Sequence, residues 1–250
     1  LAVNGKRIWL SFRLINGLKR LAYPEAQGVT ADGAIGPIYD DLAEHLRATH
    51  EVIEFSYDWR RPVEEEARRL AQVAEAALNA REGSGQPVRF VAHSMGGVVV
   101  RTLQLEAPEL FERLMARAGA RVLMLGTPNG GSWAPMQVLS GDDTFGNTLV
   151  AFGAPFQDAS ARALMAAMPG FLQLQACLTD ATQGLADEAT WRSLAERDVA
   201  AVRERNWWHN DETQLNAYTW GVPPQSVLDQ ARALRERLDS KGRLLSGGEQ

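Results

Sequence analysis

The 250-residue sequence contains one cysteine, Cys177, so it can form no internal disulfide. No apolar run is long enough to cross a bilayer, and no signal-peptide pattern stands at the start. The metal-site patterns H-E-x-x-H and C-x-x-C are absent, and His45 and His50 lie off one helical face. The net charge of −5 gives no indication of a nucleic-acid partner. What remains is a globular protein with an ordinary 45% of hydrophobic and 23% of charged residues.

Strand-like and helical patterns alternate in the middle of the sequence. Three short apolar runs predict strands: "EVIEF" (51–55), "VRFVA" (88–92) and "RVLML" (121–125). The stretch between the first two repeats apolar residues at helical spacing after Pro62, and a second helix is expected from the glycines at 96–97 to about Glu106. This alternation predicts an α/β fold with a mostly parallel sheet and right-handed crossovers.

The flanks divide the chain into three parts. Residues 1–131 are expected to form the α/β core, and residues 132–222 hold helical fragments without strand candidates, as in a helical cap or insertion. Residues 223–250 begin with an amphipathic helix over 223–240 and end in a tail.

Ser94 stands between the second predicted strand and the second predicted helix, in "VRFVAHSMGGVVVR" (88–101). In the G-x-S-x-G turn of a serine hydrolase, small residues flank the nucleophile two positions before and after it, and here these are Ala92 and Gly96. The backbone N–H of Met95 would then donate to the oxyanion. The alternative is that Ser94 merely caps the helix, for which serine is common. The matching strand and helix favour the nucleophile.

Several stretches together resemble the lecithin:cholesterol acyltransferase-like lipases and acyltransferases, a branch of the α/β-hydrolases. They are "YDWR" (57–60), "AHSMGG" (92–97) and "LGTPNGGS" (125–132), with weaker matches in "NGKRIWLS" (4–11) and "MPGFLQL" (168–174). The resemblance implies a lipid-like acyl ester as substrate and an acyl-Ser94 intermediate, which water or an acceptor alcohol would resolve. It implies no metal and no organic cofactor.

Each of these stretches also has a structural interpretation that involves no catalytic role. We expect Asp58, Trp59 and Arg60 to cap and pack the turn after the first strand. "GTPNGGS" is either a flexible connection or, as in the family, the border of the active-site mouth. Trp133 lines an acyl pocket or simply packs, and the sequence does not decide between the two.

The rest of a catalytic triad is not evident from the sequence. The family order is Ser, Asp, His, and only His209, in "NWWHND", follows Ser94, so it is the candidate base. Asp142 and Asp143 follow in the right order without further support, and His93 is expected to point to the opposite side of the strand from Ser94. No late strand and no early "PG" or "HG" turn for a second oxyanion donor is seen. We therefore expect an internal piece of a longer enzyme, incomplete at both ends.

Two classes of function remain open. One is a serine acyl-ester hydrolase or O-acyltransferase, and the other is a non-catalytic α/β-hydrolase-like module that binds a lipid or protein partner. The first 21 residues are basic and apolar without an acidic residue, which suits either contact with an anionic membrane surface or, as we favour, packing on the sheet. Hydrolysis versus transfer, oligomeric state and cellular location do not follow from the sequence.

Overall fold

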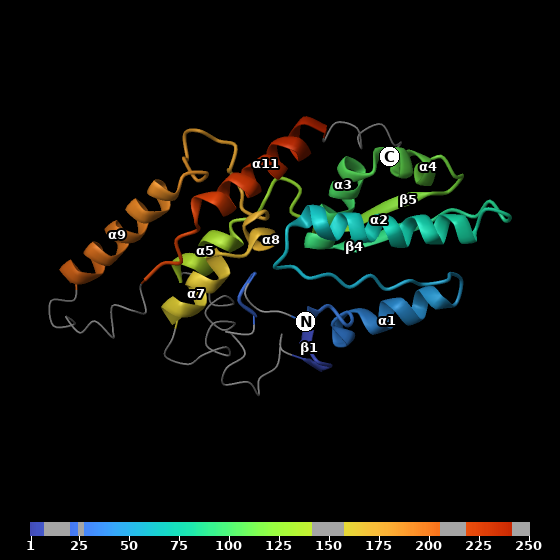
Figure 1. Cartoon of the computed structure of the whole chain (residues 1–250), viewed down its shortest axis with the longest axis horizontal. Helices are drawn as coiled ribbons and strands as arrows, with labels where there is room; N and C mark the ends of the chain where they lie inside the picture. Colours follow the sequence, from blue (N-terminus) through green and yellow to red (C-terminus); the bar gives the residue numbers. More distant parts are fainter. Residues whose placement is uncertain (8–20, 25–27, 142–157, 206–218, 242–250) are drawn as a thin grey trace.

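A computed structural model of the chain describes residues 1–7, 21–24, 28–141, 158–205 and 219–241 (Figure 1). Strands β1 (Ala2–Val3), β2 (Lys6–Arg7) and β3 (Val29–Thr30) form a small antiparallel sheet in the order β2-β1-β3. Strands β4 (Arg89–His93) and β5 (Arg121–Leu125) pair in parallel, with Arg89 opposite Arg121 and His93 opposite Leu125. The helices are α1 (Gly36–Arg47), α2 (Val63–Ala80), α3 (Met95–Glu106), α4 (Pro108–Met115), α5 (Ala134–Ser140), α7 (Asp158–Ala166), α8 (Pro169–Leu172), α9 (Glu188–Arg205) and α11 (Gln225–Lys241).

The parallel pair and its helices form the first hydrophobic core. Helix α2 begins with Pro62 at the N-cap and three glutamates in its first turn, which suit the positive end of the helix dipole. Its buried face packs against α3, and α2, α3 and α4 share one core with one side of the β4–β5 pair (Figure 1). The chain therefore passes from β4 to α3 in a turn that is packed against this core.

Most elements predicted for the middle of the chain are confirmed. The strand predicted over 88–92 is β4, displaced by one residue, and the strand over 121–125 is β5. The two predicted helices are α2 and α3.

The strand predicted over 51–55 is wrong. Residues 51–57 are not assigned to a strand, and Ile53 is 53% exposed. A short apolar run forms a strand only where a neighbouring strand completes its hydrogen bonds, and no described strand pairs with this segment. Among the described residues the parallel sheet thus has two strands, and the other sheet is antiparallel, so a mostly parallel sheet is not evident.

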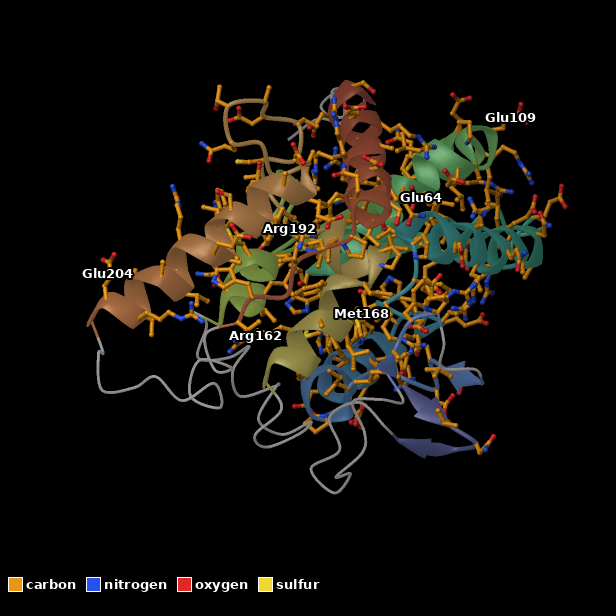
Figure 2. The ribbon with its side chains drawn as sticks, turned by 60° about the vertical axis from the view of Figure 1, so that its left-hand side comes forward. Glu64, Glu109, Arg162, Met168, Arg192 and Glu204 are labelled. Carbon is orange, nitrogen blue, oxygen red and sulfur yellow. The ribbon has the colours of Figure 1, made fainter. Side chains whose placement is uncertain are left out.

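In the described part of the second half of the chain, the regular elements are helices. Helices α5, α7 and α8 pack in a second core with the buried Trp191 of α9, and an isolated bridge joins Ser132 to Gln175. In Figure 2, α9 extends outward from Arg192 to Glu204. The boundaries at 131 and 222 stay a prediction.

Helix α11 joins the two cores. It confirms the helix predicted over 223–240 and crosses between the two groups of helices in Figure 1. Leu234 and Leu238 lie in the first core, whereas Leu228 and Ala231 lie in the second. One face of a single helix is therefore buried against both halves of the molecule.

The basic segment at the start of the chain lies largely outside the described residues, which omit 8–20, so its two interpretations stay predictions. In the part of the chain that the structure describes, no helix has both the length and the apolar character to span a bilayer.

Candidate active site

Ser94 occupies a sharp turn between β4 and α3. Its backbone has φ +52° and ψ −126°, a conformation that costs a non-glycine residue on the order of 1–3 kcal/mol. Its N–H donates to the carbonyl of Leu125 at 2.9 Å, which extends the β4–β5 ladder by one bond. Its carbonyl accepts from the N–H of Gly97 at 3.1 Å, which begins the helix. The turn therefore takes one residue to pass from strand to helix, and the side chain at that residue is exposed.

The helix-capping interpretation of Ser94 does not agree with this geometry. Ser94 stands at the N-cap position of α3, but its side chain makes no capping hydrogen bond. A capping serine usually has an extended backbone and accepts from an N–H of the first turn, whereas Ser94 has a positive φ. The Ser94 side chain is thus not used as a helix cap.

The two glycines of the turn differ in the space around them. A Cβ on Gly96 would stand 3.9 Å from the Cβ of Ala92, an ordinary contact, so both small residues of the motif face one another. A Cβ on Gly97 would instead overlap the side chain of Thr127, which follows β5. The first turn of α3 therefore lies directly against the loop that begins at Gly126.

The first backbone N–H groups of α3 directly follow Ser94 in the chain. The first N–H groups of a helix have no partner within it, and here the N–H of Gly97 is used by the carbonyl of Ser94. Among the described residues no acceptor pairs with the N–H of Met95. Met95 is the first residue of α3, which is the position expected for the oxyanion donor.

The loop "GTPNGGS" after β5 is held on both sides. Arg101 of α3 and Arg235 of α11 both donate to the carbonyl of Asn129, at 3.0 Å and 2.6 Å. At its far end, Ser132 and the segment 174–176 exchange hydrogen bonds of 2.7 Å and 2.9 Å. The loop is therefore anchored, which contradicts the flexible-connection interpretation. Trp133, beside it, is 45% exposed, so it is not core packing.

The packing role expected for "YDWR" agrees with the structure. Asp58 and Arg60 are 4% and 3% exposed and form a two-pronged ion pair, with Nη2 to Oδ2 at 2.6 Å and Nε to Oδ1 at 2.9 Å. Arg60 also donates to the carbonyl of Leu21 at 3.0 Å. Gly170 of α8 donates to the carbonyl of Arg60 and leaves no room there for a side chain. This turn fastens three distant segments together.

The histidines leave the general base unassigned. His45 lies exposed on α1, and His50, just after α1, contacts Arg89 with 2.7 Å between Nε2 and Nη1. His93, exposed at the end of β4, has its Nδ1 2.7 Å from the hydroxyl of Tyr39. Within the described residues no hydrogen bond joins the Ser94 hydroxyl to a histidine or a carboxylate.

The candidate base His209 lies outside the described residues, and so do Asp142 and Asp143. No cluster of histidine, cysteine, aspartate or glutamate able to hold a metal ion occurs in the described ranges.

The family model described as "Lecithin:cholesterol acyltransferase" matches residues 27–217, about three quarters of the chain. The chain belongs to the lecithin:cholesterol acyltransferase family. No curated protein and no solved structure matches it. The matched range includes "YDWR", the Ser94 turn and the anchored loop, so the three most specific stretches of the sequence lie within it.

For a lecithin:cholesterol acyltransferase family member, the α/β-hydrolase fold and an acyltransferase or lipase type of activity on lipid are the general expectation. The helices, the parallel β4–β5 pair and the turn between β4 and α3 are consistent with that fold. The sequence assigned no role to the hydroxyl of Tyr57, which lies close to the first turn of α3. The serine motif does not indicate this proximity, because it arises only when distant parts of the chain pack together.

Proposed function

We propose that the chain is a serine-dependent acyl-ester hydrolase or O-acyltransferase that acts on lipid-like esters through an acyl-Ser94 intermediate. The observation that carries the proposal is the backbone of Ser94, held at φ +52° at the start of α3 with a side chain that does no capping. Strain of this kind is kept where the surroundings enforce it, and it is concentrated at functional sites. Membership of the lecithin:cholesterol acyltransferase family supports the same class of chemistry.

The chemistry follows from the position of the hydroxyl. Ser94 Oγ attacks the ester carbonyl and gives its proton to a general base, because a neutral hydroxyl is a weak nucleophile. The carbonyl oxygen becomes an oxyanion and accepts from the N–H of Met95 at the positive end of α3. The tetrahedral species collapses, the C–O bond to the alcohol breaks, and the alcohol leaves with the proton. Water or an acceptor alcohol then attacks acyl-Ser94 in the same manner and releases the acyl group.

His209 is the proposed base, since it is the one histidine after Ser94 in the chain. This assignment rests on the order Ser, Asp, His of the family triad along the chain. The acid that would orient it is not assigned. No metal and no organic cofactor is needed for acyl transfer by a serine.

The test is intact-mass analysis after exposure to a fluorophosphonate, with Ser94→Ala and His209→Ala beside the wild type. We expect one adduct per chain in the wild type, none in Ser94→Ala, and labelling slowed at least 100-fold in His209→Ala. Full-rate labelling of His209→Ala would exclude that histidine as the base while leaving Ser94 in place.

A folded wild-type chain that stays unlabelled would overturn the catalytic proposal. That outcome would favour the binding-module alternative, in which the serine is retained without activation. Circular dichroism of the same sample establishes that the chain is folded.

A further inference from the structure

Tyr57 lies in the segment that joins α1 to α2 and has packing contacts on both sides along the chain. Its ring stacks on that of Phe55, with 6.3 Å between centroids and 20° between the planes. On its other side, the buried ion pair of Asp58 and Arg60 anchors the backbone. The position of the Tyr57 side chain is therefore determined by contacts both before and after it.

The Tyr57 hydroxyl reaches the turn that carries Ser94. Its oxygen lies 3.9 Å from the place where a Cβ on Gly96 would stand, and Gly96 is two residues after Ser94. The unused N–H groups at the start of α3 belong to this same turn. The hydroxyl thus lies near the first turn of α3, whose first residue, Met95, carries the N–H expected to bind an oxyanion.

This hydroxyl makes no hydrogen bond with any described residue. The nearby Tyr39 has its own hydroxyl 2.7 Å from Nδ1 of His93. The Tyr57 oxygen is not fully buried, so it keeps contact with solvent. A hydroxyl that contacts solvent and has no protein partner is free to donate to a ligand. A ligand oxygen at the turn would satisfy it.

The hydroxyl is a donor throughout the neutral range. Burial raises the pKa of Tyr57 well above its ordinary value, and Tyr39 and Glu66 nearby add to the shift. The phenol therefore keeps its proton and can give a hydrogen bond to an oxygen that becomes negative.

We propose that Tyr57 is a second oxyanion donor: its hydroxyl donates to the ester carbonyl oxygen as Ser94 attacks, beside the N–H of Met95. This inference rests on the proposed function. The phenol proton stays on Tyr57, and no covalent bond of Tyr57 forms or breaks. The hydrogen bond strengthens as charge develops on the carbonyl oxygen, so it accelerates the reaction more than it strengthens binding.

The test compares Tyr57→Phe with the wild type on a p-nitrophenyl acyl ester and on a fluorophosphonate. Phenylalanine keeps the ring that stacks on Phe55 and removes only the hydroxyl. We expect kcat to fall about 100-fold with KM nearly unchanged, and phosphonylation of Ser94 to slow in parallel. The urea unfolding midpoint should stay that of the wild type. The matched control is Tyr23→Phe, which removes the hydroxyl of a tyrosine packed against the second core, and its kcat should not change.

The outcomes separate the two proposals. A wild type that is not phosphonylated overturns the serine mechanism and this inference together. A wild type that is labelled, with Tyr57→Phe labelled at the same rate, overturns the role of Tyr57 alone. A fall in kcat that comes with a lower unfolding midpoint, or a change in KM alone, also overturns it, because a packing or binding role would then explain the effect.

Discussion

At the scale of single residues, the turn at Ser94 contains two glycines, Gly96 and Gly97, with different amounts of space beside them. A Cβ on Gly96 would make ordinary contacts with Ala92 and Tyr57, whereas a Cβ on Gly97 would overlap the side chain of Thr127. The G-x-S-x-G motif names only the first of these glycines. The second is required by the approach of the loop after β5, so the structure adds a constraint that the motif does not contain.

The two glycines therefore predict different outcomes for the same substitution. Gly97→Ala should lower the free energy of unfolding by about 1–3 kcal/mol, because the added methyl overlaps Thr127. Gly96→Ala should be neutral within about 0.5 kcal/mol, since its contacts would be ordinary ones. Urea unfolding of both variants measures the difference. Thr127→Ala in the Gly97→Ala background should recover part of the loss, and equal effects at the two glycines would contradict the overlap.

At the scale of elements, the turn over residues 57–61 connects parts of the chain that the sequence does not place together. Arg60 bonds to Leu21, and its carbonyl accepts from Gly170. Arg60 and Asp58 are both buried, so each needs the other to compensate its charge.

Asp58→Asn should accordingly lower the free energy of unfolding by about 3–5 kcal/mol, since it leaves the buried Arg60 charge uncompensated. The control is Glu236→Gln, which breaks an exposed pair with Arg232 on α11 and should cost less than about 0.5 kcal/mol. Equilibrium urea denaturation checks both. A loss below about 1 kcal/mol for Asp58→Asn would show that the pair is not needed to hold this turn.

The sequence predicted those elements whose pattern lies within their own residues. Helix α2 and strands β4 and β5 follow from periodicity and from the residues at their ends, and Ser94 follows from the small residues around it. The strand over 51–55 was wrong because a strand needs a neighbour, which no local pattern contains. The proximity of Tyr57 to the same turn was invisible for the same reason: it depends on how distant segments pack.

At the scale of the whole molecule, the question is whether the two cores unfold together. Helix α11 gives Leu234 to the first core and Leu228 to the second, and Trp59 packs against both. The carbonyl of Asn129 is also shared between α3 and α11 through Arg101 and Arg235. The proposed boundaries at 131 and 222 divide the sequence, but buried side chains connect the parts on either side of them.

We accordingly expect one cooperative unit. Leu228→Ala and Leu234→Ala, both at fully buried positions, should each lower the free energy of unfolding by about 2–5 kcal/mol, and Arg232→Ala on the exposed face by less than about 0.5 kcal/mol. Hydrogen exchange read on peptides from α3 and α8 distinguishes the alternatives. Leu228→Ala should speed exchange in α3 as much as in α8, although its side chain lies in the second core. Faster exchange confined to α8 would mean that the cores open independently and that α11 couples them only weakly.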